Sequence, residues 1–248
     1  MKVIALYSIK GGVGKTASAV NLAYMCAQGG NHTLLWDLDP QGAASFNLRI
    51  KAKLAGGPKA LFGRDIMRYV KQSDYDNLDL LPADFSNRKL DLLFDARTRR
   101  KQQVRRLLES VADRYDYVFI DSPPGLTLVV ENILRAADLV LSPLIPSTLS
   151  LRTLDQLTEF VRHPKLRGLR LWVFFSMVDV RRQLHREVMK QLATQRQGLM
   201  RHFIPYSSDI ERMGVIRAPV EVFARRSQGG LAYRGLWSEV ARRLTDHG

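Results

Sequence analysis

The stretch Ile9-Lys10-Gly11-Gly12-Val13-Gly14-Lys15-Thr16 decides the fold of this 248-residue chain. A short apolar segment, residues 2–7, precedes it and is typical of a buried parallel strand, while a helical pattern begins at Ser18. A glycine-rich turn between a strand and a helix directs backbone N–H groups and the positive end of the helix dipole at one point, which favours a bound phosphate. We therefore expect Lys15 to contact the β- and γ-phosphates of a nucleotide and the Thr16 hydroxyl to ligate Mg²⁺.

This loop departs from the strict P-loop pattern at one position, because Ile9 stands where that pattern has glycine. A second lysine, Lys10, opens the loop instead. A flexible glycine turn between core elements is the alternative interpretation, and the strand and helix patterns on either side argue against it. Residues 10–16 resemble the deviant Walker A box of the ParA/MinD family of ATPases, in which the first lysine is the signature residue.

The resemblance implies a nucleotide site shared between two copies of the chain. In that family two protomers face each other across two ATP molecules, and the signature lysine, here Lys10, reaches into the partner's site. A cation supplied in this way stabilises the charge that develops on the transferred phosphoryl group. The resemblance makes Lys10 and Lys15 catalytic. The expected nucleotide-binding residues of the loop are Lys10, Gly11, Gly12, Val13, Gly14, Lys15, Thr16 and Ala17. Ala17 departs from the family pattern, because many relatives carry a second threonine there.

Two further apolar runs end in aspartate. Residues 33–36 lead into Asp37-Leu38-Asp39-Pro40-Gln41-Gly42, and residues 116–120 lead into Asp121-Ser122-Pro123-Pro124-Gly125. Strands of open α/β sheets bind ligands at their carboxyl ends, where an aspartate can hold a Mg²⁺-bound water. Both segments resemble later boxes of the same family. By position, Asp37 and Asp121 are expected at the Mg²⁺ ion with Thr16, and Asp39 is expected to orient the attacking water. The alternative for Asp37 and Asp39 is an N-cap or turn role.

The composition agrees with one globular α/β domain spanning residues 1–248, with 46% hydrophobic residues. The single cysteine, Cys26, excludes an internal disulfide and a cysteine-rich metal site, and with it the iron–sulfur chemistry of the nitrogenase iron protein. No signal peptide and no long apolar run is evident, so we expect a soluble, cytoplasmic protein. The expected architecture is a doubly wound, mostly parallel sheet with helices on both faces, and residues 48–77 are its least informative segment.

The net charge of +14 favours a polyanionic partner. Residues 151–248 carry 18 Lys and Arg against 9 Asp and Glu. In the helical pattern from Arg181 to Gln197, basic residues recur every four positions beside an apolar face of Leu184, Val188 and Leu192. Such a stripe fits the phosphates of duplex DNA. The expected DNA-binding residues are Arg182, Arg186, Lys190, Arg212, Arg217, Arg225 and Arg226. A plain solvated face is the alternative, and it is the preferred interpretation of the dense basic run at residues 97–106.

The resemblance covers nearly the whole chain and is closest to Soj-like ParA proteins that lack an amino-terminal DNA-binding domain. Met177 and Pro205 match family positions near the nucleotide. Residues 230–244 resemble a closing helix that packs on the domain, which favours core packing over the membrane contact of MinD. The implied function is an ATPase, with ATP and Mg²⁺ as cofactors, that dimerises, binds nucleoid DNA non-specifically and positions a cargo. A ParB-like adaptor would stimulate its hydrolysis. A MinD-like membrane-cycling ATPase and a P-loop amide ligase are the rival hypotheses.

Overall fold

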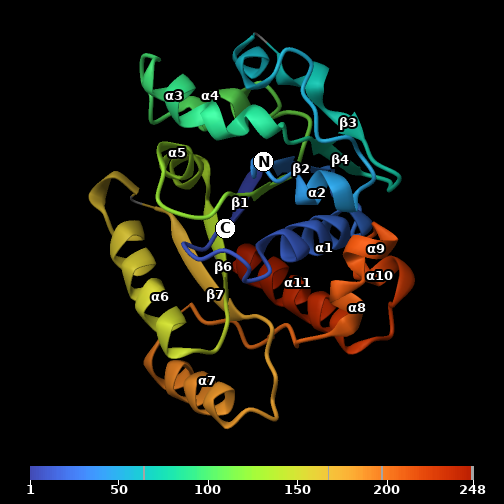
Figure 1. The fold of residues 1–248 in the computed structure, drawn as a ribbon, viewed down its shortest axis with the longest axis vertical. Helices are drawn as coiled ribbons and strands as arrows, with labels where there is room; N and C mark the ends of the chain where they lie inside the picture. Colours follow the sequence, from blue (N-terminus) through green and yellow to red (C-terminus); the bar gives the residue numbers. More distant parts are fainter. Residues whose placement is uncertain (64, 167, 197, 247–248) are drawn as a thin grey trace.

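The computed structural model describes residues 1–63, 65–166, 168–196 and 198–246. Its centre is a seven-stranded sheet in the order β3-β4-β2-β5-β1-β6-β7, in which all neighbours are parallel except the edge pair β3 and β4 (Figure 1). The strands are β1 (Lys2–Leu6), β2 (Thr33–Asp37), β3 (Lys71–Gln72), β4 (Leu78–Leu81), β5 (Tyr117–Asp121), β6 (Leu139–Leu144) and β7 (Arg170–Phe175). This is the doubly wound, mostly parallel sheet that the sequence predicts.

Helices cover both faces of the sheet (Figure 1). The α-helices are α1 (Lys15–Gln28), α2 (Ala43–Asn47), α3 (Leu90–Asp95), α4 (Gln103–Glu109), α5 (Leu128–Ala136), α6 (Thr148–Val161), α7 (Gln183–Gln195), α8 (Ser208–Glu211), α9 (Met213–Ile216), α10 (Val220–Phe223) and α11 (Gln228–Asp246). Short 3₁₀ turns lie at Pro58–Phe62, Ile66–Tyr69, Phe85–Lys89 and Pro164–Leu166. Among the described residues, no helix is both long and apolar enough to cross a membrane.

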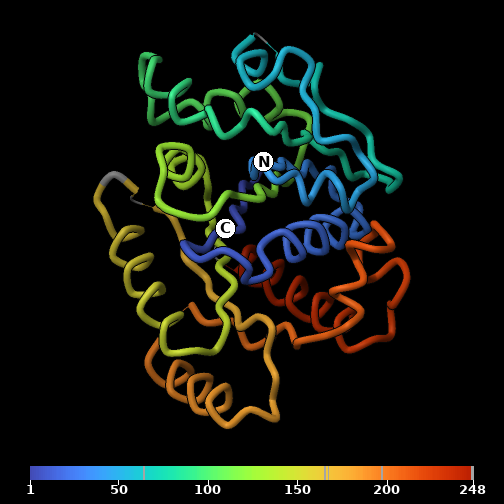
Figure 2. The backbone as a smooth tube through the Cα atoms, in the orientation of Figure 1, coloured from blue at the N-terminus to red at the C-terminus, as the bar shows by residue number. Residues whose placement is uncertain are grey.

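Alternate side chains of each strand point to opposite faces and build two cores. On β1, for example, Ile4 and Leu6 pack with α1 and α11, whereas Val3 and Ala5 pack with α4 and α5. The parallel strands are apolar on both faces because both faces are covered. The backbone trace shows the first helix, in blue, beside the last, in red (Figure 2). Helix α11 therefore packs directly on α1, the helix that follows the glycine-rich loop.

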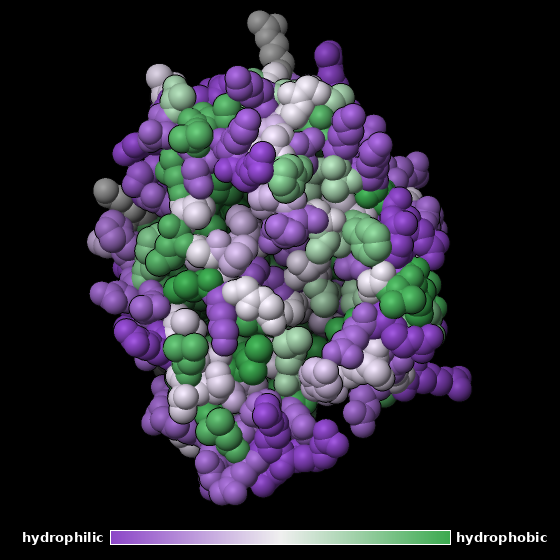
Figure 3. Space-filling model, viewed as in Figure 1, coloured by the Kyte–Doolittle hydropathy of each residue, from purple (hydrophilic) through white to green (hydrophobic). Residues whose placement is uncertain are grey.

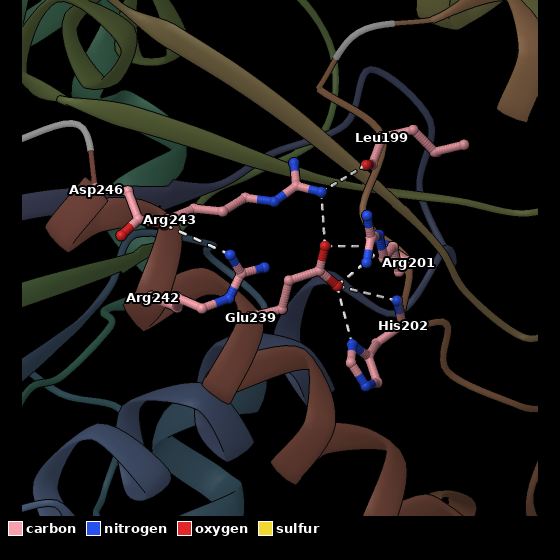
Figure 4. Close-up of polar contacts among 7 residues, drawn as sticks. All are labelled: Leu199, Arg201, His202, Glu239, Arg242, Arg243 and Asp246. Atoms are coloured by element: carbon pink, nitrogen blue, oxygen red, sulfur yellow. Dashed lines mark hydrogen bonds and ion pairs between the residues drawn. The ribbon is translucent and has the colours of Figure 1, made fainter.

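A buried carboxylate fastens α11 to the segment that follows β7. Glu239 accepts hydrogen bonds from the backbone N–H groups of Arg201 and His202, from the His202 ring and from the Arg243 guanidinium (Figure 4). Burial opposes ionisation of Glu239, but these hydrogen bonds outweigh it and lower its pKa. The apolar face of α11, with Tyr233, Leu236 and Val240, is buried against the sheet and α1. Core packing of the closing helix is confirmed.

The helix α7 covers β7 at the edge of the sheet, and its buried face differs from the predicted one. Val188 and Leu192 are buried as expected, but the third buried residue is His185, not Leu184, whose side chain is 47% exposed. The Nδ1 atom of His185 accepts a hydrogen bond from the backbone N–H of Asp179, so the histidine caps the loop before the helix. That polar partner explains why a histidine takes the position predicted for leucine. The helix ends at Gln195, and the predicted end at Gln197 lies outside the described residues.

Candidate nucleotide and magnesium site

The loop between β1 and α1 has the backbone geometry that its glycines predict. Gly12 and Gly14 have φ values of 69° and 90°, which L-residues with a side chain rarely adopt. A Cβ atom on Gly14 would lie 2.8 Å from the hydroxyl oxygen of Ser176, so the glycine also allows close approach to the end of β7. Helix α1 begins at Lys15, directly after this turn. Its amino terminus and the loop N–H groups therefore face the carboxyl ends of the strands, as a phosphate site requires.

Lys15 is buried at the centre of this loop. Its side chain is 7% exposed, and its Nζ atom donates a hydrogen bond of 3.3 Å to the carbonyl oxygen of Lys10. Burial lowers the pKa of Lys15, while the charges of Asp121 and Asp39 act in the opposite direction. A desolvated ammonium group beside two carboxylates is poised to contact a multiply charged phosphate. Lys10 lies at the mouth of the loop and is half-buried.

Asp37 and Asp121 end neighbouring strands and pair directly in the β2–β5 register. Both side chains are fully buried. One Asp37 oxygen accepts hydrogen bonds from the backbone N–H and the hydroxyl of Ser45, at 2.8 and 2.7 Å. Burial raises the pKa of Asp37 to about 6, and burial followed by the charge of Asp37 raises the pKa of Asp121 well above its usual range. Two buried carboxylates of the same charge repel each other unless a cation or a proton lies between them.

The donor set fits a magnesium ion. Among the described residues, neither Asp121 oxygen and only one Asp37 oxygen has a hydrogen-bond partner of regular geometry. The Thr16 hydroxyl lies near enough to Asp121 to lower its pKa. In the described part of the chain, no group of three or more acidic, histidine or cysteine side chains is arranged to hold a metal ion by itself. Mg²⁺ commonly uses one or two carboxylates together with phosphate oxygens and water, so Thr16, Asp37 and Asp121 would hold it with a nucleotide.

Asp39 lies in the turn that follows β2. One of its carboxylate oxygens accepts the backbone N–H of Gln41 at 3.0 Å, and its carbonyl oxygen accepts the N–H of Gly42. These bonds form the local turn that the alternative interpretation of Asp39 anticipated. The same side chain is half-buried and contributes charge at both Lys15 and Asp121. The turn role and the position beside the phosphate loop are therefore compatible.

The two more distant nucleotide-binding predictions, Met177 and Pro205, lie on adjacent segments. Val178 and Pro205 form a parallel bridge, and Met177 has a φ of 55°, a strained conformation for a residue with a side chain. Pro205 lines a cleft of about 680 Å³ with residues 178–181, Phe203, Tyr206, Gln228, Leu231 and Ala232. Ser176, which contacts Gly14 of the phosphate loop, immediately precedes Met177. The chain from Ser176 to Val178 therefore connects the phosphate loop to the segment that lines this cleft.

The predicted DNA-binding residues do not form one cluster. Arg182, Arg186 and Lys190 are exposed along α7, which lies at the lower end of the molecule (Figure 1), where hydrophilic side chains gather (Figure 3). The other four belong to the segment from α8 to α11. Arg212 and Arg225 are exposed and lie 3.9 and 3.2 Å from Asp209 and Glu221. Arg226 is exposed as well.

Arg217 is half-buried and engaged with the protein. Its guanidinium carbon lies 4.4 Å from the centre of the Phe46 ring, and its Nε atom donates a 2.9 Å hydrogen bond to the Phe46 carbonyl oxygen. A cation above an aromatic face is attracted by the ring quadrupole. Arg217 thereby ties α9 to α2, the helix that follows the Asp37–Gly42 segment.

Two polar residues of the site escaped prediction. Ser45 binds Asp37, and nothing in its local sequence marks it, since it lies eight residues further along. Tyr7 ends the first apolar segment and is fully buried, with its hydroxyl 2.7 Å from the carbonyl oxygen of Gly125. A tyrosine at the end of an otherwise apolar strand is a usable signal, because a buried phenol needs a hydrogen-bond partner.

Comparison with known proteins agrees with this geometry. Residues 1–169 match the family model described as an AAA domain. Over 250 residues the chain is 31% identical to the sporulation initiation inhibitor protein Soj of Bacillus subtilis, covering 97% of this chain and 98% of that protein. It is 32% identical over 257 residues to the chromosome partitioning protein ParA of Myxococcus xanthus, with 98% and 89% covered. The chain belongs to the ParA/MinD family of ATPases.

A solved structure shares the whole architecture of this ParA/MinD-family chain. The cobyrinic acid a,c-diamide synthase of Mycobacterium smegmatis, with bound ATP analogue and magnesium, superimposes with a TM-score of 0.84 and 26% identity. The match covers 100% of this chain and 97% of that chain. Family membership confirms the predicted ATPase activity and the predicted cofactors, ATP and Mg²⁺.

Proposed function

We propose that this ParA/MinD-family ATPase is a partition ATPase that dimerises on binding Mg-ATP, binds nucleoid DNA without sequence preference and positions a cargo. Lys15 and the loop N–H groups would bind the phosphates, and Thr16, Asp37 and Asp121 would hold Mg²⁺, which neutralises charge on the phosphates. Asp39 would orient the attacking water. Lys10 would act in the site of the second copy. Hydrolysis would release the protein from DNA, and a ParB-like adaptor on the cargo would accelerate that step.

The observation that carries the DNA-binding proposal is a link between two features. The first is the basic stripe of α7, made by Arg182, Arg186 and Lys190, and the second is the cleft lined by Pro205. Arg186 donates hydrogen bonds of 2.7 and 3.0 Å to the carbonyl oxygens of Val180 and Arg181, which line that cleft. Arg182 stands at the N-cap of the same helix. A change in the cleft on nucleotide binding would therefore reach the stripe through bonded neighbours. Cations spaced one helical turn apart supply affinity for DNA phosphates without reading sequence.

Exposed apolar side chains around the phosphate site support dimerisation on this face. Leu126 follows Gly125 directly, and Leu149 lies in the first turn of α6, after β6. Their side chains are 56% and 55% exposed. Both follow strands adjacent to β1, so they flank the loop that carries Lys10. These exposed apolar side chains would suit a two-fold contact with a second copy, in which Lys10 of each copy would enter the site of the other.

A second candidate function is an amide ligase. The likeness to the Mycobacterium smegmatis diamide synthase, at 26% identity and over the whole chain, is the observation that favours it. That hypothesis predicts ATP turnover stimulated by a small acid such as cobyrinic acid, whereas a partition ATPase responds to DNA and a protein adaptor. Turnover assays with and without the small acid separate the two.

Dimerisation is tested by measuring the molar mass of the protein in solution with Mg-ATP, with Mg-ADP and without nucleotide. A dimer in Mg-ATP, with a monomer in the other two states, is the expected result. A mass that does not depend on the nucleotide would contradict the shared site. ATP turnover of the same sample with added cobyrinic acid then serves as the assay for the ligase.

A further inference from the structure

The loop after β5, from Ser122 to Gly125, is fastened to the end of β1 at its start and to the phosphate loop at its end. At its start, the Ser122 hydroxyl donates a hydrogen bond to the carbonyl oxygen of Leu6 in β1. At its end, the Gly125 N–H donates a 3.1 Å hydrogen bond to the carbonyl oxygen of Ile9. The third bond comes from the Tyr7 hydroxyl, which donates to the Gly125 carbonyl oxygen at 2.7 Å. Both polar groups of Gly125 are therefore bound to residues that lead into the phosphate loop.

Tyr7 is held rigidly enough to fix its partner. Its ring is fully buried in the core below α5, and burial raises the pKa of its hydroxyl, which keeps it a neutral donor. Its backbone N–H is bound to Leu141 in β6. The packing of the ring and the bound backbone N–H therefore fix the position of the Tyr7 hydroxyl. A buried tyrosine hydroxyl that lost its partner would leave an unpaired polar group in the core.

The loop that Tyr7 holds is short and stiff. Pro123 and Pro124 restrict the backbone between the two anchors, and Gly125 has a φ of 85°, a conformation that favours glycine. A Cβ atom on Gly11 of the phosphate loop would lie 4.0 Å from the Cβ of Pro124, which places the two loops in contact. Asp121 immediately precedes this loop. Movement of Gly125 would therefore be transmitted to the metal-binding aspartate and to the surface that faces the γ-phosphate.

We propose that Tyr7 is a positioning residue for ATP hydrolysis, which holds the Asp121–Gly125 loop against the phosphate loop through the Gly125 carbonyl oxygen. The inference concerns the ATPase reaction and does not depend on the proposed DNA binding. Tyr7 touches neither the nucleotide nor the metal ligands in this role. Its hydroxyl acts on the reaction through the backbone of Gly125.

The test is Tyr7→Phe, which removes one hydroxyl and keeps the ring. Single-turnover hydrolysis of ATP with Mg²⁺ is expected to slow about tenfold, the effect of a lost neutral hydrogen bond that matters only in the transition state. Affinity for a non-hydrolysable ATP analogue is expected to change less than about twofold, since the P-loop contacts remain. Hydrogen exchange of the Gly125 amide is expected to become faster.

The chain offers a matched control in Tyr115→Phe. Tyr115 is also a buried tyrosine with a 2.7 Å donated hydrogen bond, to Asp79, but it lies before β5, at the end opposite to Asp121. Tyr115→Phe loses a hydrogen bond to a carboxylate, so it is expected to lose at least as much stability as Tyr7→Phe, while only Tyr7→Phe slows hydrolysis. An unchanged or faster single-turnover rate in Tyr7→Phe would overturn the proposal. An equal loss of rate in Tyr115→Phe would also overturn it, because the effect would then be general destabilisation.

Discussion

Asp37 and Asp121 lie opposite each other on adjacent parallel strands, fully buried, with three of their four carboxylate oxygens lacking a hydrogen-bond partner of regular geometry among the described residues. A core tolerates such a pair only at a cost, since each ionised carboxylate is desolvated and repels the other. The arrangement makes sense if a cation completes it. We therefore propose that the pair destabilises the free protein and binds a metal ion.

Asp121→Asn is expected to raise the melting temperature of the free protein and to reduce the stabilisation that Mg-ADP provides. Without nucleotide, at a pH high enough to ionise both carboxylates, the variant should melt a few degrees higher, because the second buried negative charge is removed; about 1–2 kcal/mol corresponds to such a shift in a chain of this size. In Mg-ADP the wild-type protein should gain stability and the variant should gain little. Thermal melts with and without Mg-ADP measure both effects.

Asp116→Asn is the control for this prediction. Asp116 lies just before β5, at the end of the sheet opposite to the predicted metal site. Its carboxylate accepts a hydrogen bond from the backbone N–H of His32 at 2.8 Å. That variant should keep the stabilisation by Mg-ADP. If Asp121→Asn is stabilised by Mg-ADP as strongly as the wild type, the assignment of Asp121 to the metal is wrong.

On the proposed mechanism, Lys10→Ala is expected to retain ATP binding and to lose ATP turnover, because Lys15 and the loop N–H groups would bind the phosphates while Lys10 would act across the dimer. Lys51→Ala, a change of an exposed lysine outside the loop, should leave turnover unchanged. Nucleotide affinity and turnover are measured on each variant.

Mixing Lys10→Ala with Lys15→Ala distinguishes action in the partner's site from action in the lysine's own site. A mixed dimer contains one site with an intact Lys15 that receives Lys10 from the other copy, so turnover should partly return. If Lys10 acts in its own site, neither copy has a complete site and the mixture stays inactive. Absence of any recovery would refute the shared site.

Asp39→Ala is expected to trap the ATP-bound form on DNA. In the proposed mechanism Asp39 orients the attacking water and makes no phosphate contact, so binding should persist while hydrolysis stops. The dissociation rate from immobilised duplex, after free protein is removed, measures the trapping. Release as fast as that of the wild type would show that Asp39 does not control hydrolysis.

Much of this fold was predictable because its signals are local. The alternation of apolar strands with helices predicts a parallel sheet, and the motifs at the ends of β1, β2 and β5 predict where a phosphate and a metal would lie. Asp37, Asp121 and Thr16 come together because parallel strands end at one edge of the sheet. That convergence follows from topology, which the order of the motifs already implies.

The contacts that depend on distant partners were not predictable. Ser45 reaches Asp37 because α2 folds back over the end of β2, and Tyr7 reaches Gly125 across 118 residues of sequence. His185 replaces Leu184 in the buried face of α7 because a backbone N–H of the preceding loop needs an acceptor. Helical spacing gives the face of a helix to within one residue, and a buried polar partner decides between neighbours.

In the proposed function, nucleotide state controls binding to DNA. The most direct measurement is affinity for random-sequence duplex DNA in ATP, in ADP and without nucleotide, across a series of salt concentrations. Tight binding in ATP alone is expected, with log affinity falling linearly with log salt at a slope of about −0.9 per phosphate contacted.

Two triple variants, each of which loses three positive charges, serve as the test of the α7 stripe and as its control. Changing Arg182, Arg186 and Lys190 to alanine should weaken binding and reduce the magnitude of the slope by about 2.7, if each contacts one phosphate. Changing the exposed Arg99, Arg105 and Arg106 to alanine removes three charges elsewhere and should leave the slope nearly unchanged. Equal affinity in all three nucleotide states, or no binding in any of them, would contradict the account.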